Sequence, residues 1–179
     1  MQQQNPLGYQ SIPSLLKSFA IPSIIAMLVG SLYNIVDQVF IGQGVGYLGN
    51  AATNVSYPLT TICLAISLLI GIGSASRFSL YLGSGRQENA AKVAGNGICM
   101  MVVFGVIYAV LVELFLTPLL TAFGATAAVM PYAATYSRII ALGMPFQIIT
   151  TGMSKLILAD GSPKYSMTCT LIGAVINKI

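Results

Sequence analysis

The stretch ATNVSYPLTTICLAISLLIGIGSASRFSLYL, residues 52–82, decides the class of fold, and Arg77 is its single charged residue. A helix needs about 20 predominantly apolar residues to cross the roughly 30 Å hydrocarbon core of a bilayer. The apolar residues here form long runs and do not alternate with polar ones, so a helix is favoured over a strand of a membrane barrel. We therefore expect a transmembrane helix at 52–82.

Similar apolar segments lie on both sides of this stretch, and turn-rich links separate them. We expect further helices at about 14–41, 90–120 and 127–159, the last one interrupted or bent at Pro131 and Pro145, and an incomplete one at 164–179. A signal peptide is the competing interpretation of the first segment, because Lys17 precedes an apolar run, but no small-residue cleavage site follows. The prediction is an all-α, polytopic transmembrane helix bundle.

The composition supports a membrane protein and argues against other classes. Charged residues make up 7% of the chain and hydrophobic residues 56%, whereas a soluble domain carries about 25% charged residues. The net charge is +4, but the basic residues are scattered singly, so we expect no nucleic-acid partner. The chain has no His, and its carboxylates lie far apart in the sequence. We therefore expect no enzyme. The cysteines Cys63, Cys99 and Cys169 lack metal-ligand spacing and are expected to be small buried apolar residues.

The positions of the basic residues alternate with the links. The first link, GQGVGYLGN at 42–50, and the third link, around 123–126, contain no Lys or Arg. Basic residues instead precede the first helix or flank the second and fourth links: Lys17, Arg77, Arg86, Lys92, Lys155 and Lys164. By the positive-inside rule the N-terminus and the even-numbered links are cytoplasmic. Only Arg138 departs from this pattern.

Asp37 is the sharpest functional signal, because it lies inside the first helix near its outer end. A carboxylate within a bilayer costs at least about 2.5 kcal/mol, so such a residue usually faces a cavity or a partner. Tyr33 and Asn34 share its helical face at i−4 and i−3. We interpret Asp37 as a carboxylate that exchanges a proton or cation for substrate. The alternative is an interfacial Asp that emerges into the headgroups.

Other residues carry weaker signals. Glu113 at the outer end of the third helix is interpreted as an interfacial charge. Arg138 is either a cavity cation or a partner of Glu113, and the sequence favours neither. The run GIGSA at 71–75 offers small residues at helical spacing, which predicts close helix packing. Pro145 is interpreted as a kink.

Three stretches of the sequence together resemble motifs of the multidrug and toxic compound extrusion (MATE) transporters. The motifs are YNIVDQVFIG at 33–42, downstream of Ile21-Pro22, and the link LGSGRQENA at 82–90. The link LADGSP at 158–163 is a looser match, because Leu158 stands where the family often has Arg. The resemblance extends from about Pro13 onward. It implies a twelve-helix antiporter with two six-helix lobes, of which residues 1–179 would be an N-terminal fragment holding about five helices of the first lobe.

The resemblance also implies site residues. They are Asp37 and Asn177 for proton or cation coupling and a Na⁺ site, and Gly83, Gly85 and Arg86 for a cytoplasmic loop motif. Tyr33 and Asn34, which share the helical face of Asp37, are assigned to the substrate cavity. Na⁺ or H⁺ would be the coupling ion, and no other cofactor or metal is expected. The family's fifth-helix Asp would follow beyond Ile179.

The expected function is cation-coupled export of drugs and other xenobiotics across the plasma (inner) membrane of a bacterium. The expected partners are the lipid bilayer, small amphipathic or cationic substrates, and the second lobe of the same protein. Two alternatives stay open. One is a lipid-linked precursor flippase of the same superfamily, although such proteins line their cavity with several basic residues and only Arg138 qualifies here. The other is a small non-transporting membrane protein that oligomerises through its Gly-rich faces.

Overall fold

The computed structural model describes residues 11–176, and these form six α-helices and no strand. The helices are α1 (Ile12–Val45), α2 (Tyr47–Gly83), α3 (Gln87–Leu114), α4 (Leu116–Ala122), α5 (Met130–Ala159) and α6 (Pro163–Ile176). Within these residues, α1, α2, α3 and α5 are long and apolar enough to cross a membrane. Because the bilayer offers no water to backbone groups, helices that pair them internally are the expected solution. The predicted all-α bundle is confirmed.

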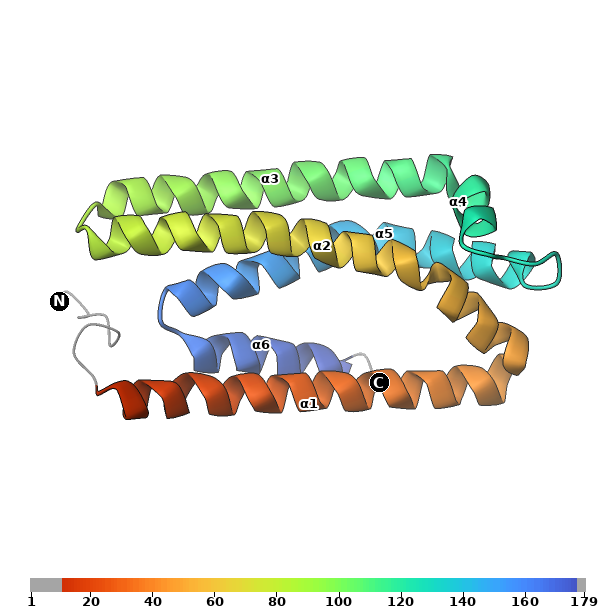
Figure 1. Ribbon diagram of the computed structural model, residues 1–179, viewed down its shortest axis with the longest axis horizontal. Helices are drawn as coiled ribbons and strands as arrows, with labels where there is room; N and C mark the ends of the chain where they lie inside the picture. Colours follow the sequence, from red (N-terminus) through yellow and green to blue (C-terminus); the bar gives the residue numbers. More distant parts are fainter. Residues whose placement is uncertain (1–10, 177–179) are drawn as a thin grey trace.

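The helices form two groups (Figure 1). α2, α3 and α5 pack closely against one another, while α1 and α6 run side by side along the other flank. α1 joins the first group chiefly through the beginning of α2. The link between α1 and α2 and the loop after α4 lie at one end of the molecule, and the links after α2 and α5 lie at the other. Pro58 lies inside α2, where its missing N–H favours the bend that Figure 1 shows.

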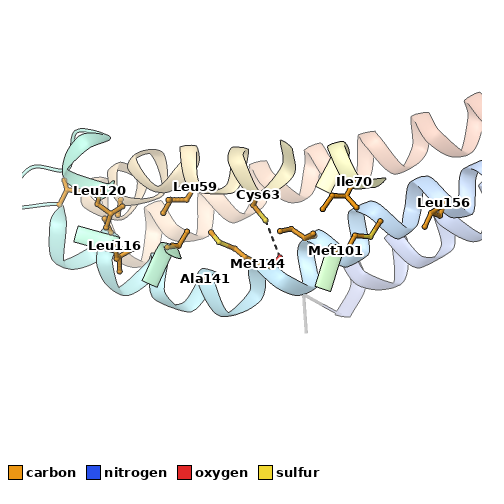
Figure 2. Packing of buried hydrophobic residues seen from close by; sticks show 14 residues of the cluster. Leu59, Cys63, Ile70, Met101, Leu116, Leu120, Ala141, Met144 and Leu156 are labelled. Carbon is orange, nitrogen blue, oxygen red and sulfur yellow. Dashed lines mark hydrogen bonds between the residues drawn. The ribbon is translucent and has the colours of Figure 1, made fainter. Parts of the chain in front are cut away.

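A row of buried side chains fills the space between α2, α3 and α5 (Figure 2). Cys63 of α2 donates to the carbonyl oxygen of Met144 of α5 across a sulfur–oxygen distance of 3.7 Å. The hydroxyls of Ser56 (α2) and Ser137 (α5) are 2.8 Å apart and buried. Polar side chains of this kind join helices inside a membrane, where an unpaired hydroxyl has no water to bind.

Small residues allow α2 and α5 to approach within backbone contact. A Cβ atom added to Gly71 would lie 2.7 Å from the Cα of Gly152. A Cβ added to Gly105 of α3 would lie 3.0 Å from the Cα of Pro145 of α5. The close packing predicted for the small-residue run at 71–75 is therefore present at Gly71. Gly73 of the same run has nothing within 4 Å of its Cβ position.

The first link differs from its prediction as a loop at 42–50. α1 and α2 continue through it, and Gly46 alone interrupts them, with φ 76°. A single left-handed residue suffices for the reversal, and glycine adopts that conformation without a steric cost. The other glycines of the link are helical. Gly49, for example, packs so closely on Val45 that its added Cβ would lie 2.8 Å from the Cβ of that residue.

The predicted third helix, 90–120, is two helices that meet at Phe115. Pro118 explains the break, because its ring clashes with the carbonyl four residues earlier, which belongs to Leu114, the last residue of α3. The predicted fourth helix, 127–159, begins instead at Met130. Pro131 therefore occupies the first turn of α5, where proline is well tolerated, and neither bends nor interrupts the helix.

The remaining boundaries differ by a few residues. The helix predicted at 14–41 spans 12–45, and the helix predicted at 52–82 spans 47–83. The incomplete helix predicted at 164–179 is α6, whose described part ends at Ile176. Helix ends commonly shift by one or two residues with the criterion used, so the larger differences reflect the helical glycines of the first link.

The contact of Gly71 with Gly152 should limit the side chain at either position. We expect Gly71→Ala to destabilise the protein by about 1–3 kcal/mol, because the backbone of α5 must move to admit the methyl group. Thermal unfolding in detergent, followed by the loss of the monodisperse fraction, measures this effect. Gly73→Ala is the matched control and should leave the unfolding temperature unchanged; equal behaviour of the two variants would contradict the packing described here.

Candidate functional site

Asp37 lies in the second half of α1 and is half-buried. Its charge acts on the phenol of Tyr136, which α5 presents from the other group of helices. Most of α1 is exposed within this chain, and Asp37 is one of its half-buried residues. The structure thus gives this intramembrane carboxylate a named neighbour that its sequence position did not indicate.

A pocket of about 400 Å³ lies between the end of α1, the beginning of α2 and the beginning of α5. Ile41 and Val45 of α1 form one wall, and Tyr132 and Tyr136 of α5 form another. Ile41 is one helical turn beyond Asp37 on the same face of α1, although Asp37 itself does not line the pocket. A wall of this kind accommodates the apolar body of an amphipathic molecule, and a carboxylate or aromatic face attracts its positive charge.

A second hollow, of about 560 Å³, lies beside α1 and is lined by carboxamide side chains. Asn34, Gln38 and Gln43 of α1 and Asn50 of α2 contribute the amides. Asn34 donates to the carbonyl of Gly30 on its own helix at 3.0 Å. The hydroxyl of Thr53 donates to the carbonyl oxygen of Asn50 at 2.9 Å and lies 3.4 Å from Oε1 of Gln38. Of these contacts, the one between Thr53 and Gln38 joins the end of α1 to the beginning of α2.

The polar residues that were predicted to share one face of the first helix therefore have different neighbours. Asn34 lines the carboxamide hollow, whereas Asp37 acts on Tyr136. Tyr33 belongs to α1, one turn before Asp37, and its side chain is outside the described part of the chain. Asn177 lies outside the described residues altogether. Its expected pairing with Asp37 stays a prediction.

The loop motif Gly83, Gly85 and Arg86 lies at the opposite end of the bundle from Asp37 (Figure 1). Gly85 has φ 77°, and the N–H of Arg86 donates to the carbonyl of Tyr81 at 2.9 Å. A left-handed glycine with a bond back into the last turn is a common way for a helix to end. In this structure the motif forms the tight link between α2 and α3.

Arg138 has a partner, which resolves the alternative that the sequence left open. Its Nε lies 3.5 Å from Oε1 of Glu113, and this ion pair joins α5 to α3. Both side chains are largely exposed, at 67% and 50%. Arg138 is therefore an outward-facing ion-pair partner of Glu113.

The described residues contain no cluster of three or more His, Cys, Asp or Glu side chains that could hold a metal ion. Cys63 is buried, as expected, but Cys99 and Cys169 are exposed on their helices. The expectation of burial was wrong for these two, because the lipid-facing side of a helix also accepts a small apolar residue.

Sequence reasoning missed Tyr136, Gln38, Asn50 and Thr53 at the site. Gln38 is adjacent to Asp37 within the motif at 33–42 and could have been found there as a further polar residue in an apolar helix. Tyr136 carries no such signal, because aromatic residues are frequent near the ends of membrane helices. Its relation to Asp37 depends on the way α5 packs.

Comparison with known proteins identifies the family. Residues 22–179 match the MatE family. The chain is 26% identical to the probable multidrug resistance protein YoeA of Bacillus subtilis (strain 168), over 97% of this chain and 39% of that protein. It is 27% identical to the multidrug export protein MepA of Staphylococcus haemolyticus (strain JCSC1435), over 94% of this chain and 37% of that protein.

Comparison with a solved structure points to the same family. The MATE multidrug transporter DinF-BH, solved in complex with a ligand, superposes with a TM-score of 0.91 and 36% sequence identity, over 99% of this chain and 40% of that one. The chain thus spans about two fifths of the length of the proteins it matches. Members of this family are transporters and not enzymes. The chain belongs to the MatE family of multi-pass membrane transporters.

Proposed function

We propose that this chain is the N-terminal lobe portion of a transporter that exports amphipathic or cationic compounds in exchange for Na⁺ or H⁺. The observation that carries the proposal is Asp37, a half-buried carboxylate on a membrane-crossing helix whose charge acts on Tyr136 of α5. A carboxylate in that position costs free energy unless a cation, a proton or a hydrogen-bond donor compensates its charge. A bound cation or proton can leave again, which makes exchange possible.

The proposed mechanism is competition for this one negative charge. When a proton or Na⁺ neutralises Asp37, a positively charged substrate loses its electrostatic partner and is released. When the proton or Na⁺ departs, the carboxylate is again available to a substrate whose apolar body contacts Ile41, Val45 and Tyr132 in the neighbouring pocket. Differential affinity of this kind is what allows one ligand to shift the population of states that bind another.

The names of the relatives support drugs as the substrate class. YoeA and MepA are named as multidrug resistance and multidrug export proteins, and DinF-BH is named as a multidrug transporter. Alternating access requires two repeats that move against each other around a central site. We therefore include the second lobe of the same protein as the required partner, with the bilayer and the substrate.

We also propose that the N-terminus is cytoplasmic, in a bacterial inner membrane. Lys17, Arg77, Arg86, Lys155 and other basic residues gather at the end of the bundle where α1 begins, whereas Arg138 lies toward the other end. The positive-inside rule places the end that is rich in Lys and Arg in the cytoplasm.

Two alternative functions are less well supported. A flippase for lipid-linked precursors would need several cationic side chains in its cavity, and Arg138, the candidate that the sequence offers, is paired with Glu113. An oligomer that assembles through glycine-rich faces would need those faces to be free. Gly71, Gly105 and Gly152 are already used in contacts between α2, α3 and α5, whereas Gly73, Gly95 and Gly143 are open.

Replacement of the carboxylate tests the proposed coupling. We expect Asp37→Asn in the full-length protein to fold and reach the membrane but to lose ethidium efflux driven by an imposed Na⁺ or pH gradient. Proteoliposomes given each gradient separately show which ion drives the wild-type protein. Glu113→Gln removes another carboxylate from the outer half of the bundle and should leave efflux unchanged. Wild-type efflux by Asp37→Asn would end the proposal.

The neighbour of Asp37 gives a second, independent prediction. Tyr136→Phe keeps the aromatic ring and removes the hydroxyl, and we expect it to weaken the apparent affinity for the coupling ion, because the phenol lies within electrostatic range of Asp37. The measurement is the ion concentration at half-maximal efflux. Tyr57→Phe, on an exposed position of α2, is the control. An unchanged ion dependence in Tyr136→Phe would show that the hydroxyl of Tyr136 takes no part in binding the coupling ion.

A further inference from the structure

A third pocket, of about 210 Å³, lies at the end of the bundle opposite Asp37, where α1, α5 and α6 meet. Ser23 and Met27 of α1 line one side, Lys155 and Leu158 of α5 another, and Ser166 and Met167 of α6 the third. Met27 is ten residues before Asp37 on α1, which corresponds to about 15 Å along the helix. This pocket is therefore separate from the candidate coupling site.

The pocket contains a cation without a counter-charge from the described part of the chain. Lys155 is half-buried, and among the described residues the ion pairs are those of Lys92 with Glu88 and of Arg138 with Glu113. Asp160 is exposed in the following link and lies beyond ion-pair distance of Lys155. The first turn of α6, which begins at Pro163, also lines the pocket, and the N-terminus of a helix carries a partial positive charge. Both features favour a negatively charged ligand.

The remainder of the wall is mainly apolar and indicates the kind of anion. Met27, Leu158 and Met167 line the pocket together with Lys155, and a free, strongly hydrated anion would gain little from contact with them. A molecule that carries a phosphate on an apolar chain can contact Lys155 with its phosphate and the apolar residues with its chain. Lys155 is one turn from the end of α5 at Ala159, and the ends of a membrane-crossing helix are where contact with headgroups is expected.

We infer that this pocket binds the phosphate of an anionic membrane phospholipid, with Lys155 as its counter-charge. Basic pockets between transmembrane helices on the cytoplasmic side are known to bind anionic headgroups. Ser166 is buried and Ser23 is exposed at the wall, so hydroxyls lie in the same pocket as the ammonium group. The assignment goes beyond the proposed transport function and does not depend on Asp37.

The bound lipid would stabilise the position of α1. Among the α1 residues whose burial is described, Pro22 is the buried one, and it belongs to this pocket. The middle of α1 has little of its surface covered by α2, α3 or α5. A phospholipid that contacts α1, α5 and α6 together would therefore add to the contacts that hold α1 in place.

Native mass spectrometry of the full-length protein tests the inference, with dioleoylphosphatidylglycerol as the probe. The wild-type protein should retain this lipid. Lys155→Gln should lower the fraction of protein with lipid bound about fivefold, the effect of one basic residue near an anionic membrane surface. Lys155→Arg should retain binding because the charge remains. Lys164→Gln, which removes a neighbouring exposed charge outside the pocket, is the matched control and should bind as the wild type does.

Further probes distinguish the possible ligands. Dioleoylglycerol has the same chains without phosphate and should not be retained. Inorganic phosphate at millimolar concentration should not displace the phospholipid. Ser23→Phe fills the pocket without a change of charge and should reduce binding as Lys155→Gln does. Unchanged binding in both of these variants, an equal loss in Lys164→Gln, retention of dioleoylglycerol, or displacement by inorganic phosphate would each overturn the assignment.

Discussion

The contact between the backbones of α2 and α5 at Gly71 and Gly152 is the interaction on which the rest of the structure depends. In a bilayer, apolar side chains gain nothing by leaving lipid for protein, so helices associate through close packing and a few hydrogen bonds. Gly71 and Gly152 permit the approach, and the hydroxyl pair Ser56–Ser137 and the Cys63 contact with Met144 continue along the same interface. α3 then packs against both helices, with Gly105 on Pro145 and the hydroxyl of Tyr108 donating to the carbonyl of Leu59 at 2.7 Å.

α1 packs less closely on this group of helices, and this looser packing leaves space for pockets. The pocket beside Tyr132 and Tyr136, the carboxamide hollow and the pocket around Lys155 all include α1 as one wall. A helix packed as tightly as α2 and α5 would leave no such spaces. These three pockets therefore lie along the helix that packs least closely on the α2–α3–α5 group.

The fold class and the approximate helices are predictable from the sequence because the bilayer imposes a simple length and hydrophobicity on each span. The predicted helix boundaries are wrong where the preference of a single residue does not decide the local structure. The glycines at 42–50 predict a loop, although all but Gly46 are helical, and the break at Phe115 follows from Pro118, whose effect falls four residues upstream. Asp37 is recognisable from its charge alone. Tyr136 and Lys155 are not recognisable as parts of pockets, because their neighbours come from helices distant in the sequence.

The distribution of charge links the two proposed sites. The few ionisable residues of the chain could have been confined to the links, where water compensates them at little cost. Asp37 and Lys155 lie instead within helices, each half-buried, and each has a pocket beside it or around it. In the proposed exchange, the cation that compensates Asp37 must be able to leave, since a permanent partner would abolish exchange. For Lys155 a lasting partner is favourable, because the proposed phospholipid would hold α1 against α5 and α6. In the two proposals, opposite charges toward opposite ends of the bundle thus serve one exchangeable ligand and one retained ligand.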